Sequence, residues 1–257
     1  MPDRVLRVAA ALLAPVLGVR QCERLNREAG GCTTLGEWAR TILTLLEIEV
    51  VLSGCALDAV IPAQGPTAVI GNHPFGILDA IVAVAVLSPL RDDLRYLGQS
   101  LLQRVPQSRT VLFPLQPTTG KPFQPSNADS LRRAMQWVQS GHVLAHFPAP
   151  SVARWNWSQR RIEDPEWSTL VGTLVRSGET CVVPMRFSGR NSLLFQAVGV
   201  ACGPLRHALL LRELLNKRGT RIQITVGPRL HKSDFPTGSS AATITSQIRD
   251  VVQSLRD

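Results

Sequence analysis

The chain has 257 residues, of which 44% are hydrophobic and only 18% are charged, so it can bury a large core and is not intrinsically disordered. Its formal net charge of +9, from 28 basic and 19 acidic residues, favours a phosphorylated ligand or an anionic membrane surface as partner, although a genomic arginine bias explains the excess equally well. Nucleic acid is disfavoured as a partner because few aromatic residues alternate with the basic clusters.

The N-terminal region predicts helices that lie on a membrane rather than span it. The uncharged run Val8–Val19 has only 12 residues, whereas a spanning helix needs about 18 to 20. Pro15 interrupts the run, and no small-residue cleavage site follows it directly. We therefore expect one or two short amphipathic helices over residues 6–25, retained in the protein rather than removed as a signal peptide.

A further helix is predicted before the first strand. The sequence Thr34-Leu35-Gly36-Glu37 has the pattern of a capping box, which opens a helix that continues to Leu46. We assign residues 1–47 to an N-terminal helical region for membrane association and residues 48–257 to the main domain.

From there on, strand-type and helix-type segments alternate along the chain. Such alternation, without a linker-like stretch, predicts a single α/β domain. The expected strands cover residues 48–52, 68–72, 143–147, 181–187 and 221–226, and the expected helices cover 77–87, 127–140, 167–176 and 243–255. Gly141 is expected to end the second of these helices as its C-cap.

The cysteines point to a reducing compartment, which here means the cytoplasm. They are odd in number and never closely paired, which argues against both a zinc site and a disulfide framework. They are Cys22, Cys32, Cys55, Cys181 and Cys202.

The stretch from Asn72 to Asp79 carries the clearest chemical signal. A short buried strand leads into His73, the turn contains Pro74 and Gly76, and Asp79 follows at the start of a helix. The turn can fold Asp79 back onto His73, where a carboxylate fixes the imidazole tautomer and stabilises the imidazolium. No serine or cysteine nucleophile lies nearby in the sequence, so the pair predicts a general base that acts on a hydroxyl or an amine.

A purely structural role is the alternative for this pair, as a turn histidine and a helix-capping aspartate. The succession of strand, turn and helix favours catalysis. The other histidines have no carboxylate at ligand spacing, and we assign them structural roles; they are His142, His146, His207 and His231.

Five further segments accompany this first block. They are a second block within 95–115, a third beginning at 146–149, a fourth within 182–192, and the runs 161–167 and 212–219. Together the segments resemble the PlsC-like glycerolipid and lysophospholipid acyltransferases, in particular the branch of hemolysin-like proteins and ornithine-lipid O-acyltransferases. His73 and Asp79 are separated by one residue more than is usual in the family, and the branch has a similar Asn-His-Pro-Phe-Gly form.

The resemblance implies a fold and a reaction. The fold is of the glycerol-phosphate acyltransferase type, with a mixed sheet flanked by helices. His73 is the base and Asp79 orients it, while an acyl group passes from acyl-CoA or from acyl carrier protein directly to the hydroxyl of a lyso-lipid, such as lyso-ornithine lipid or a lysophospholipid. No metal and no bound cofactor is implied. The protein is expected to be cytoplasmic and peripheral on the inner membrane.

The residues expected to bind substrate lie in or beside these blocks. Backbone amides near the Asn72 turn, or a residue of the fourth block, are expected to stabilise the oxyanion. The set is Asn72, Phe75, Gly76, Phe113, Phe147, Pro148, Ser151, Arg161, Pro184, Arg186, Gly189 and Arg190.

Several other side chains have two interpretations. Arg154 and Arg160 are expected on a solvated face, whereas Arg161 is expected to contact an anionic headgroup. The tryptophans at 155, 157 and 167 could have a functional role, at a membrane interface or in the wall of an acyl tunnel. Alternatively they are bulky residues of the core. The basic and apolar segment 205–221 suits either a membrane-surface helix or a core helix with a basic outer side.

One departure from the family bears on the acceptor. The third block usually continues with glycine and glutamate, but here Pro150 and Ser151 follow Ala149. A serine carries no charge and reaches less far than a glutamate. We therefore expect a changed acceptor. Two alternatives stay open: transfer to a hydroxyl or amine of a small metabolite, and an inactive homologue that binds lipid or carrier protein.

Overall fold

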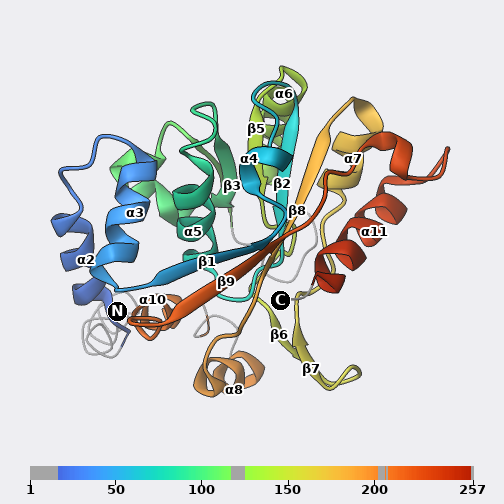
Figure 1. Cartoon of the computed structure of the whole chain (residues 1–257). Coiled ribbons are helices and arrows are strands. Elements are labelled where there is room, and N and C mark those ends of the chain that lie inside the picture. The colour runs from blue at the N-terminus through green and yellow to red at the C-terminus, as the bar shows by residue number, and fades with distance from the viewer. Residues whose placement is uncertain (1–16, 117–124, 202–205, 207, 256–257) are drawn as a thin grey trace.

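A computed structural model describes residues 17–116, 125–201, 206 and 208–255 (Figure 1). Within these ranges seven strands form one sheet in the order β1-β9-β8-β2-β5-β3-β4. Their bounds are β1 Glu49–Gly54, β2 Thr67–Gly71, β3 Arg95–Gln99, β4 Leu112–Leu115, β5 Val143–His146, β8 Cys181–Phe187 and β9 Arg221–Val226. The run Val8–Val19, expected as an amphipathic helix, lies mostly outside the described residues, as do Cys202 and His207.

The sheet is mixed, as expected. The strands β8, β2, β5, β3 and β4 run parallel to one another, while β1 and β9 pair in parallel with each other and β9 pairs antiparallel with β8. The carboxyl ends of five strands therefore meet at one edge of the sheet. β2 is fully buried and lies between β8 and β5, so the chain that leaves it enters the middle of that edge.

Helices cover both faces of the sheet because alternate residues of each central strand point to opposite sides. Val69 of β2 packs with α3 (Leu35–Leu45) and α5 (Ile77–Leu87). Ala68 and Ile70 pack instead with α6 (Ala128–Gln139), α7 (Leu170–Ser177) and α11 (Ala241–Ser254). Figure 1 shows these two groups of helices on either side of the strands. The single α/β domain predicted from the sequence is confirmed.

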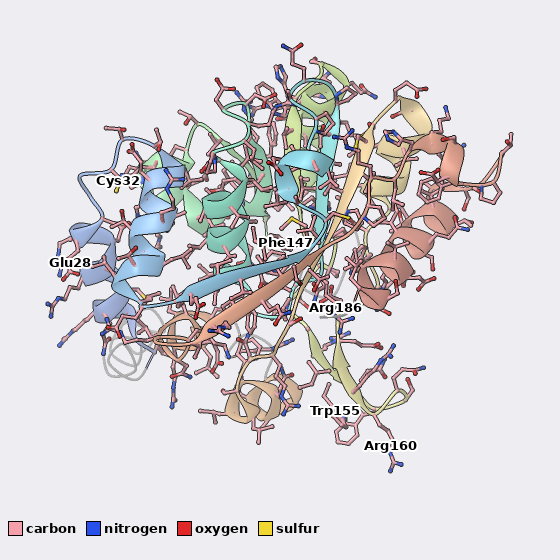
Figure 2. The ribbon with its side chains drawn as sticks, in the orientation of Figure 1. Glu28, Cys32, Phe147, Trp155, Arg160 and Arg186 are labelled. Atoms are coloured by element: carbon pink, nitrogen blue, oxygen red, sulfur yellow. The ribbon has the colours of Figure 1, made fainter. Side chains whose placement is uncertain are left out.

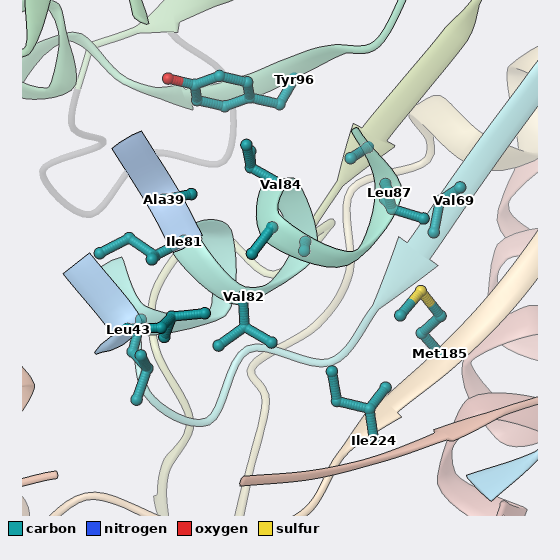
Figure 3. Packing of buried hydrophobic residues seen from close by; sticks show 14 of the residues in the cluster. Ala39, Leu43, Val69, Ile81, Val82, Val84, Leu87, Tyr96, Met185 and Ile224 are labelled. Atoms are coloured by element: carbon teal, nitrogen blue, oxygen red, sulfur yellow. The ribbon is translucent and has the colours of Figure 1, made fainter. Parts of the chain in front are cut away.

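Helix α5 is apolar on nearly every side because it lies between α3 and the sheet (Figure 3). Its Ile81 and Val84 belong to the same buried cluster as Ala39 and Leu43 of α3, together with Met185 of β8. The helix is thus held in place from both sides. The packing also fixes the position of Asp79, which lies in its first turn.

Helix α3 begins where the capping box predicts. The Thr34 hydroxyl accepts from the Glu37 amide at 3.1 Å, and the Glu37 carboxylate accepts from the Thr34 amide at 3.2 Å. Its inner face is part of the main buried cluster, so α3 is packed as firmly as the elements that follow it. Helix α2 (Val19–Glu28) precedes it and packs on α10 (Leu210–Leu215).

Several elements were not predicted. Strands β3 and β4 contain Gly98 and Pro114, which are residue types that disfavour a strand. Strands β6 (Arg154–Asn156) and β7 (Arg161–Glu163) form a separate antiparallel hairpin. Helices α4 (Leu57–Val60) and α8 (Leu193–Ala201) were also missed. Helix α7 begins three residues later than expected, because Trp167 belongs to the preceding loop and donates to Asp164.

The hairpin β6–β7 and helix α8 follow the carboxyl ends of β5 and β8. Figure 1 shows both projecting from the lower end of the molecule. Within the described residues, no helix has the length and apolar character needed to cross a membrane.

Candidate active site

The histidine block forms a tight connection between β2 and α5. Gly76 adopts a left-handed backbone with φ 88°, which turns the chain into the helix and favours glycine at this position. Asp79, fully buried in the first helical turn, accepts the backbone N–H groups of Phe75 at 2.9 Å and Gly76 at 2.8 Å through Oδ2. The carboxylate therefore fixes the shape of the loop that carries His73.

The same oxygen of Asp79 faces the histidine. His73 Nδ1 lies 2.9 Å from Asp79 Oδ2, although its ring N–H is poorly aligned for a hydrogen bond. Catalytic hydrogen bonds are often misaligned in proteins without substrate and tighten when substrate binds. Burial raises the pKa of Asp79, while the neighbouring histidine and the two backbone donors oppose that rise. Since Nδ1 faces the carboxylate, Nε2 is the nitrogen left for an incoming proton.

Two phenylalanines set the position of the imidazole ring. Phe147 stacks on His73 with ring centroids 5.0 Å apart, and Phe187 meets Phe147 edge-on at 5.5 Å. At Gly71 a Cβ atom would lie 3.0 Å from both phenyl rings, so the close approach favours glycine there. Phe147 is thus brought to the site, as predicted. Figure 2 shows it beneath the central strands.

A second buried carboxylate, which the sequence reasoning missed, holds the backbone of His73. The His73 N–H lies 3.1 Å from both oxygens of Asp164, and the Trp167 indole donates to Oδ2 at 3.0 Å. On the other side, the His73 carbonyl accepts the Ala153 N–H at 2.9 Å. Burial raises the pKa of Asp164, with the nearby histidine acting in the opposite direction. The one available signal was its place in the run 161–167, where only Arg161 was singled out.

Asn72 acts on the protein backbone rather than facing a ligand. Its amide N–H donates to the Phe187 carbonyl at 3.0 Å, and its oxygen accepts the Phe187 N–H at 2.7 Å. This clamp joins the ends of β2 and β8. The amides of His73, Phe75 and Gly76 all donate to carboxylates, so the expectation that amides of this turn stabilise an oxyanion is not met by these three.

The fourth block packs directly on the histidine loop. Phe75 is buried against Gly189, where a Cβ atom would lie 2.6 Å from the phenyl ring. The Lys217 ammonium lies 5.0 Å from the centroid of the same ring and donates to the Arg190 carbonyl at 2.8 Å. Burial lowers the pKa of Lys217. Asn191 donates to the Phe75 carbonyl at 3.3 Å. Phe75 and Gly189, both expected to bind substrate, are therefore in contact, and Lys217 is a further charged group beside them.

The remaining predicted residues fall into two groups. Gly76 belongs to the loop, Pro148 is buried one residue after Phe147, and Ser151 is half-buried in the segment that leads to the hairpin. The others are held elsewhere. Phe113 is buried in the cluster with α6 and α7, beneath Arg95.

Three more are also engaged away from His73. Pro184 is buried within β8 and its carbonyl accepts the Gly227 N–H at 2.8 Å. Arg186 donates to the Gln253 carbonyl of α11. Arg161 is exposed on the hairpin and pairs with Glu163 at 2.7 Å. The structure thus gathers His73, Asp79, Phe75, Gly76, Phe147 and Gly189, and it leaves Phe113, Arg161, Pro184 and Arg186 apart from them.

Two other histidines, expected to be structural, have surroundings that the sequence did not show. His142 does have a carboxylate partner, Asp93, whose Oδ2 lies 3.0 Å from Nδ1; the pairing is created by the fold between distant segments. His146 ends β5 beside the site, and burial, helped by the positive charge of His73, lowers its pKa to about 3. Among the described residues no cluster of three His, Cys, Asp or Glu side chains is arranged to hold a metal.

A cavity of about 620 Å3 lies between the hairpin, α8 and α11. Asp164 lines it and also binds the His73 amide, while Arg154, the neighbour of Ala153, lines its other side. Gln196 and Arg249 also line the cavity. The buried amide oxygen of Gln196 and the buried Nε of Arg249 have no hydrogen-bond partner. The cavity is polar and carries both charges, so it suits a headgroup rather than an acyl chain.

A second, narrow pocket of about 30 Å3 is almost entirely apolar. It lies between α3, α5 and the segment after β3, and its wall includes Ile77, Ala80, Ile81 and Val84 along one face of α5. Since α5 also carries Asp79, this pocket begins close to the histidine loop.

With this geometry in view, the chain can be compared with known proteins. No family model matches it. Two curated proteins named lyso-glycine lipid O-acyltransferase are similar in sequence. The one from Phocaeicola vulgatus is 24% identical over 202 residues, covering 76% of this chain and 70% of the relative. The one from Bacteroides thetaiotaomicron is 25% identical over 202 residues, covering 76% of this chain and 72% of the relative.

A solved structure supports the fold. The crystal structure of the 1-acyl-sn-glycerophosphate acyltransferase PlsC from Thermotoga maritima matches with a TM-score of 0.51 and 12% identity, over 98% of this chain and 93% of that one. The likeness extends over the whole domain, including the sheet whose edge carries His73. Relatives and fold together confirm that the chain resembles the PlsC-like lipid acyltransferases.

Proposed function

We propose that this protein is an O-acyltransferase that moves a fatty acyl group from a thioester to the hydroxyl of a lyso-lipid, with His73 as the general base. The comparisons support an acyltransferase that acts on a lipid. The observation that carries the mechanism is the position of His73 Nδ1, 2.9 Å from the buried Asp79 carboxylate, at the carboxyl edge of the sheet.

The reaction is a direct transfer. The acceptor hydroxyl gives its proton to His73 Nε2 while its oxygen attacks the thioester carbonyl, and a tetrahedral intermediate forms. When the carbon–sulfur bond breaks, the leaving thiolate takes the proton from the imidazolium. Asp79 stabilises the imidazolium in between, and Phe147 keeps the ring in one orientation. We assign the oxyanion to a donor of the fourth block, next to Gly189, because three amides of the histidine loop already serve carboxylates.

The polar cavity is the proposed place of the acceptor headgroup. Arg154 offers a cation to a phosphate or carboxylate, and Glu166 offers an acceptor to a hydroxyl, an amide or an ammonium group. Candidate acceptors are lyso-ornithine lipid and lysophospholipids. Lyso-glycine lipid is a third candidate, because the two similar proteins are named for it. We propose that Glu166, which lines the cavity, supplies the carboxylate that Ser151 lacks.

The donor is an acyl group on coenzyme A or on acyl carrier protein. The apolar pocket beside α5, with Ala80 and Val84 in its wall, is too small for a whole fatty acyl chain, so we assign only a short part of the chain to it. Because both donor chain and acceptor are lipids, we propose that the protein works as a peripheral protein on the cytoplasmic face of the inner membrane.

A catalytically inactive lipid-binding homologue is the second candidate, favoured by one observation. Ser151 stands where the family carries a glutamate, and it is half-buried beside the loop. If that carboxylate is essential and Glu166 does not replace it, the fold would bind lipid without transferring an acyl group.

The deciding experiment measures free thiol released from acyl-CoA and from acyl carrier protein thioesters. The acceptors are lysophosphatidate, lyso-ornithine lipid, lyso-glycine lipid, and small hydroxy or amino metabolites. Release that depends on a lyso-lipid and falls at least about 100-fold in His73→Ala, but not in the matched control His231→Ala, supports the proposal.

Three results contradict it in different ways. Release that persists in His73→Ala overturns the mechanism. Release only with small metabolites overturns the acceptor class. An absence of release with every acceptor, together with retained lipid binding, favours the inactive homologue.

A further inference from the structure

We infer that the protein docks on anionic phospholipid bilayers through a surface made by the hairpin β6–β7 and the start of α8. This inference specifies where the proposed enzyme meets its lipid, and it rests on the proposed function only for the presence of a lipid acceptor. It assigns the contact to a part of the chain far from residues 1–47, where sequence analysis places membrane association.

The first observation is a group of large apolar side chains that face solvent. Leu193 is 75% exposed and Leu194 46%, both on the first turn of α8, while Trp157 is 73% exposed beyond β6. Within the described residues, Trp155, Trp157, Leu193, Leu194 and Leu52 of β1 are the large hydrophobic side chains left exposed, and four of these five lie on the hairpin and α8. Such clustering marks an interaction site rather than ordinary surface.

The second observation is that the two elements adjoin. Gln196 of α8 donates to the Ala153 carbonyl, at the start of the hairpin, at 3.4 Å. The two indoles, Trp155 and Trp157, form an edge-to-face pair with centroids 6.0 Å apart. Figure 2 shows Trp155 and Arg160 at the lower extremity of the molecule, below Phe147 and Arg186. The apolar side chains therefore belong to one projecting end.

The third observation is the charge around this end. Arg154, Arg160 and Arg161 on the hairpin and Arg190 before α8 are all exposed. Against them stand Glu166, which is exposed, and Glu163, which is already paired with Arg161. Tryptophan prefers the interface between headgroups and acyl chains, and arginine next to it attracts anionic headgroups. Exposed leucines next to tryptophans and arginines are suited to the interface of an anionic bilayer, which offers an apolar phase beside charged headgroups.

The fourth observation is the position of the surface relative to the site. Trp155 and Trp157 line the polar cavity as well as the projecting end, and the cavity reaches Asp164, which binds the His73 amide. A lipid headgroup at the bilayer surface is thus next to the cavity that contains Asp164, the partner of the His73 amide. The leucines on α8 do not line the cavity, so they can be changed without altering it.

The test measures co-sedimentation of the full chain with vesicles of phosphatidylcholine alone and of phosphatidylcholine with 30% phosphatidylglycerol, a composition chosen at roughly the anionic content of bacterial membranes. The wild type is expected to bind the anionic vesicles, and less strongly at high salt. The double variant Leu193→Ser/Leu194→Ser should bind at least about 10-fold more weakly. The matched control Leu52→Ser removes a leucine with 45% exposure on β1 and should bind like the wild type.

A second measurement guards against a folding defect and against confusion with the catalytic proposal. The double variant should keep wild-type thermal unfolding and wild-type thiol release with a water-soluble, short-chain acceptor below its micelle concentration. It should lose most of its activity on an acceptor embedded in vesicles. If no acyl transfer is seen with any acceptor but the vesicle results hold, the docking surface stands and the proposed reaction fails.

Three outcomes overturn the docking surface. One is equal binding of anionic vesicles by the double variant and the wild type. Another is binding that Arg160→Gln and high salt leave unchanged, because the charge argument then fails. The last is a wild-type dimer, found by sedimentation without lipid, that the double variant dissociates, since a second copy of the chain is then what covers this end.

Discussion

At the scale of single residues, the site depends on two buried carboxylates and a partly buried phenylalanine around one histidine. Asp79 shapes the loop and faces the imidazole, Asp164 holds the backbone amide, and Phe147 supports the ring. A base must stay within a small fraction of an ångström of its productive position, so residues that fix the backbone affect the rate without touching substrate. In the proposed mechanism, Asp164 is such a positioning residue.

Removal of the Asp164 carboxylate is expected to lower kcat more than it raises KM. Asp164→Ala leaves the His73 N–H and the Trp167 indole without a partner, and we expect a loss in kcat of about 10- to 100-fold. Asp164→Asn keeps one acceptor oxygen and should recover part of the loss. The measurement is steady-state thiol release for both variants. A change confined to KM would mean that Asp164 serves the acceptor cavity instead.

A second prediction at this scale concerns His146 and the pH dependence of stability. Its pKa of about 3 in the folded protein lies below its unfolded value of about 6.5, so the unfolded chain binds an extra proton between these values. Its contribution to stability is therefore present above pH 6.5 and is lost as the pH falls toward 3. The slope approaches about 1.4 kcal/mol per pH unit.

The check compares the free energy of unfolding of the wild type and His146→Leu between pH 7 and pH 4. Asp79 and Asp164 titrate in both proteins, so their contributions cancel in the difference. The difference should shrink or reverse as the pH falls, because only the wild type loses stability through His146. A difference that does not vary with pH would show that His146 is charged or exposed in the folded protein.

At the scale of elements, close helix packing decides what the helix sequence alone does not. Gly172 lies inside α7 where this helix crosses α11, and a Cβ atom there would lie 2.0 Å from the Ala241 carbonyl oxygen. Helix propensity alone favours alanine over glycine by about 1 kcal/mol. The contact is with backbone, which cannot move aside cheaply, so the packing effect is the larger of the two.

Gly172→Ala is therefore expected to destabilise the protein by about 1 to 3 kcal/mol. Gly178→Ala is the matched control, because a Cβ atom at that position meets nothing within 4 Å, and its stability should change by less than about 0.5 kcal/mol. Denaturant unfolding of both variants gives the comparison. A more stable Gly172→Ala protein would mean that α7 and α11 are farther apart than described.

At the scale of the whole molecule, five parallel strands bring distant segments to one edge of the sheet. The histidine loop, the 147–153 segment, the hairpin and the fourth block all leave from that edge. The N-terminal side of the chain is part of the same body as far as α3, since Trp38, Ala39, Ile42 and Leu43 belong to the main buried cluster.

A point variant tests how far the folded domain extends. Ile42→Ala removes a buried side chain from α3 and should lower the free energy of unfolding by about 2 to 5 kcal/mol. Thr44→Ala, on the exposed side of the same helix, should change it by less than about 0.5 kcal/mol. Thermal or denaturant unfolding distinguishes them. Equal stability of the two variants would support a boundary after residue 47.

The sequence by itself determined the alternation of strands and helices, the capping box of α3 and the block from Asn72 to Asp79. These depend on interactions within a few residues: periodic burial, a turn glycine, a carboxylate three positions after its donor. The observed bounds of α5 and β8 match the expected ones because they too depend on local sequence patterns. The block from Asn72 to Asp79 and the five segments that accompany it carried the resemblance that the relatives and the fold later confirmed.

Only the tertiary structure decided which residues meet His73. Asp164 reaches its amide from 91 positions along the chain, and Lys217 reaches Phe75 through a strand order that the sequence does not state. The tertiary structure also decided which predicted residues lie away from His73. Phe113 points to the opposite face of the sheet, and Arg161 lies on the hairpin. Long-range pairing depends on how the strands are ordered and which face each side chain takes. A local pattern shows which side chains of one element share a face, but not which other element that face will meet. The histidine block could therefore be found from the sequence, whereas its distant partners could not.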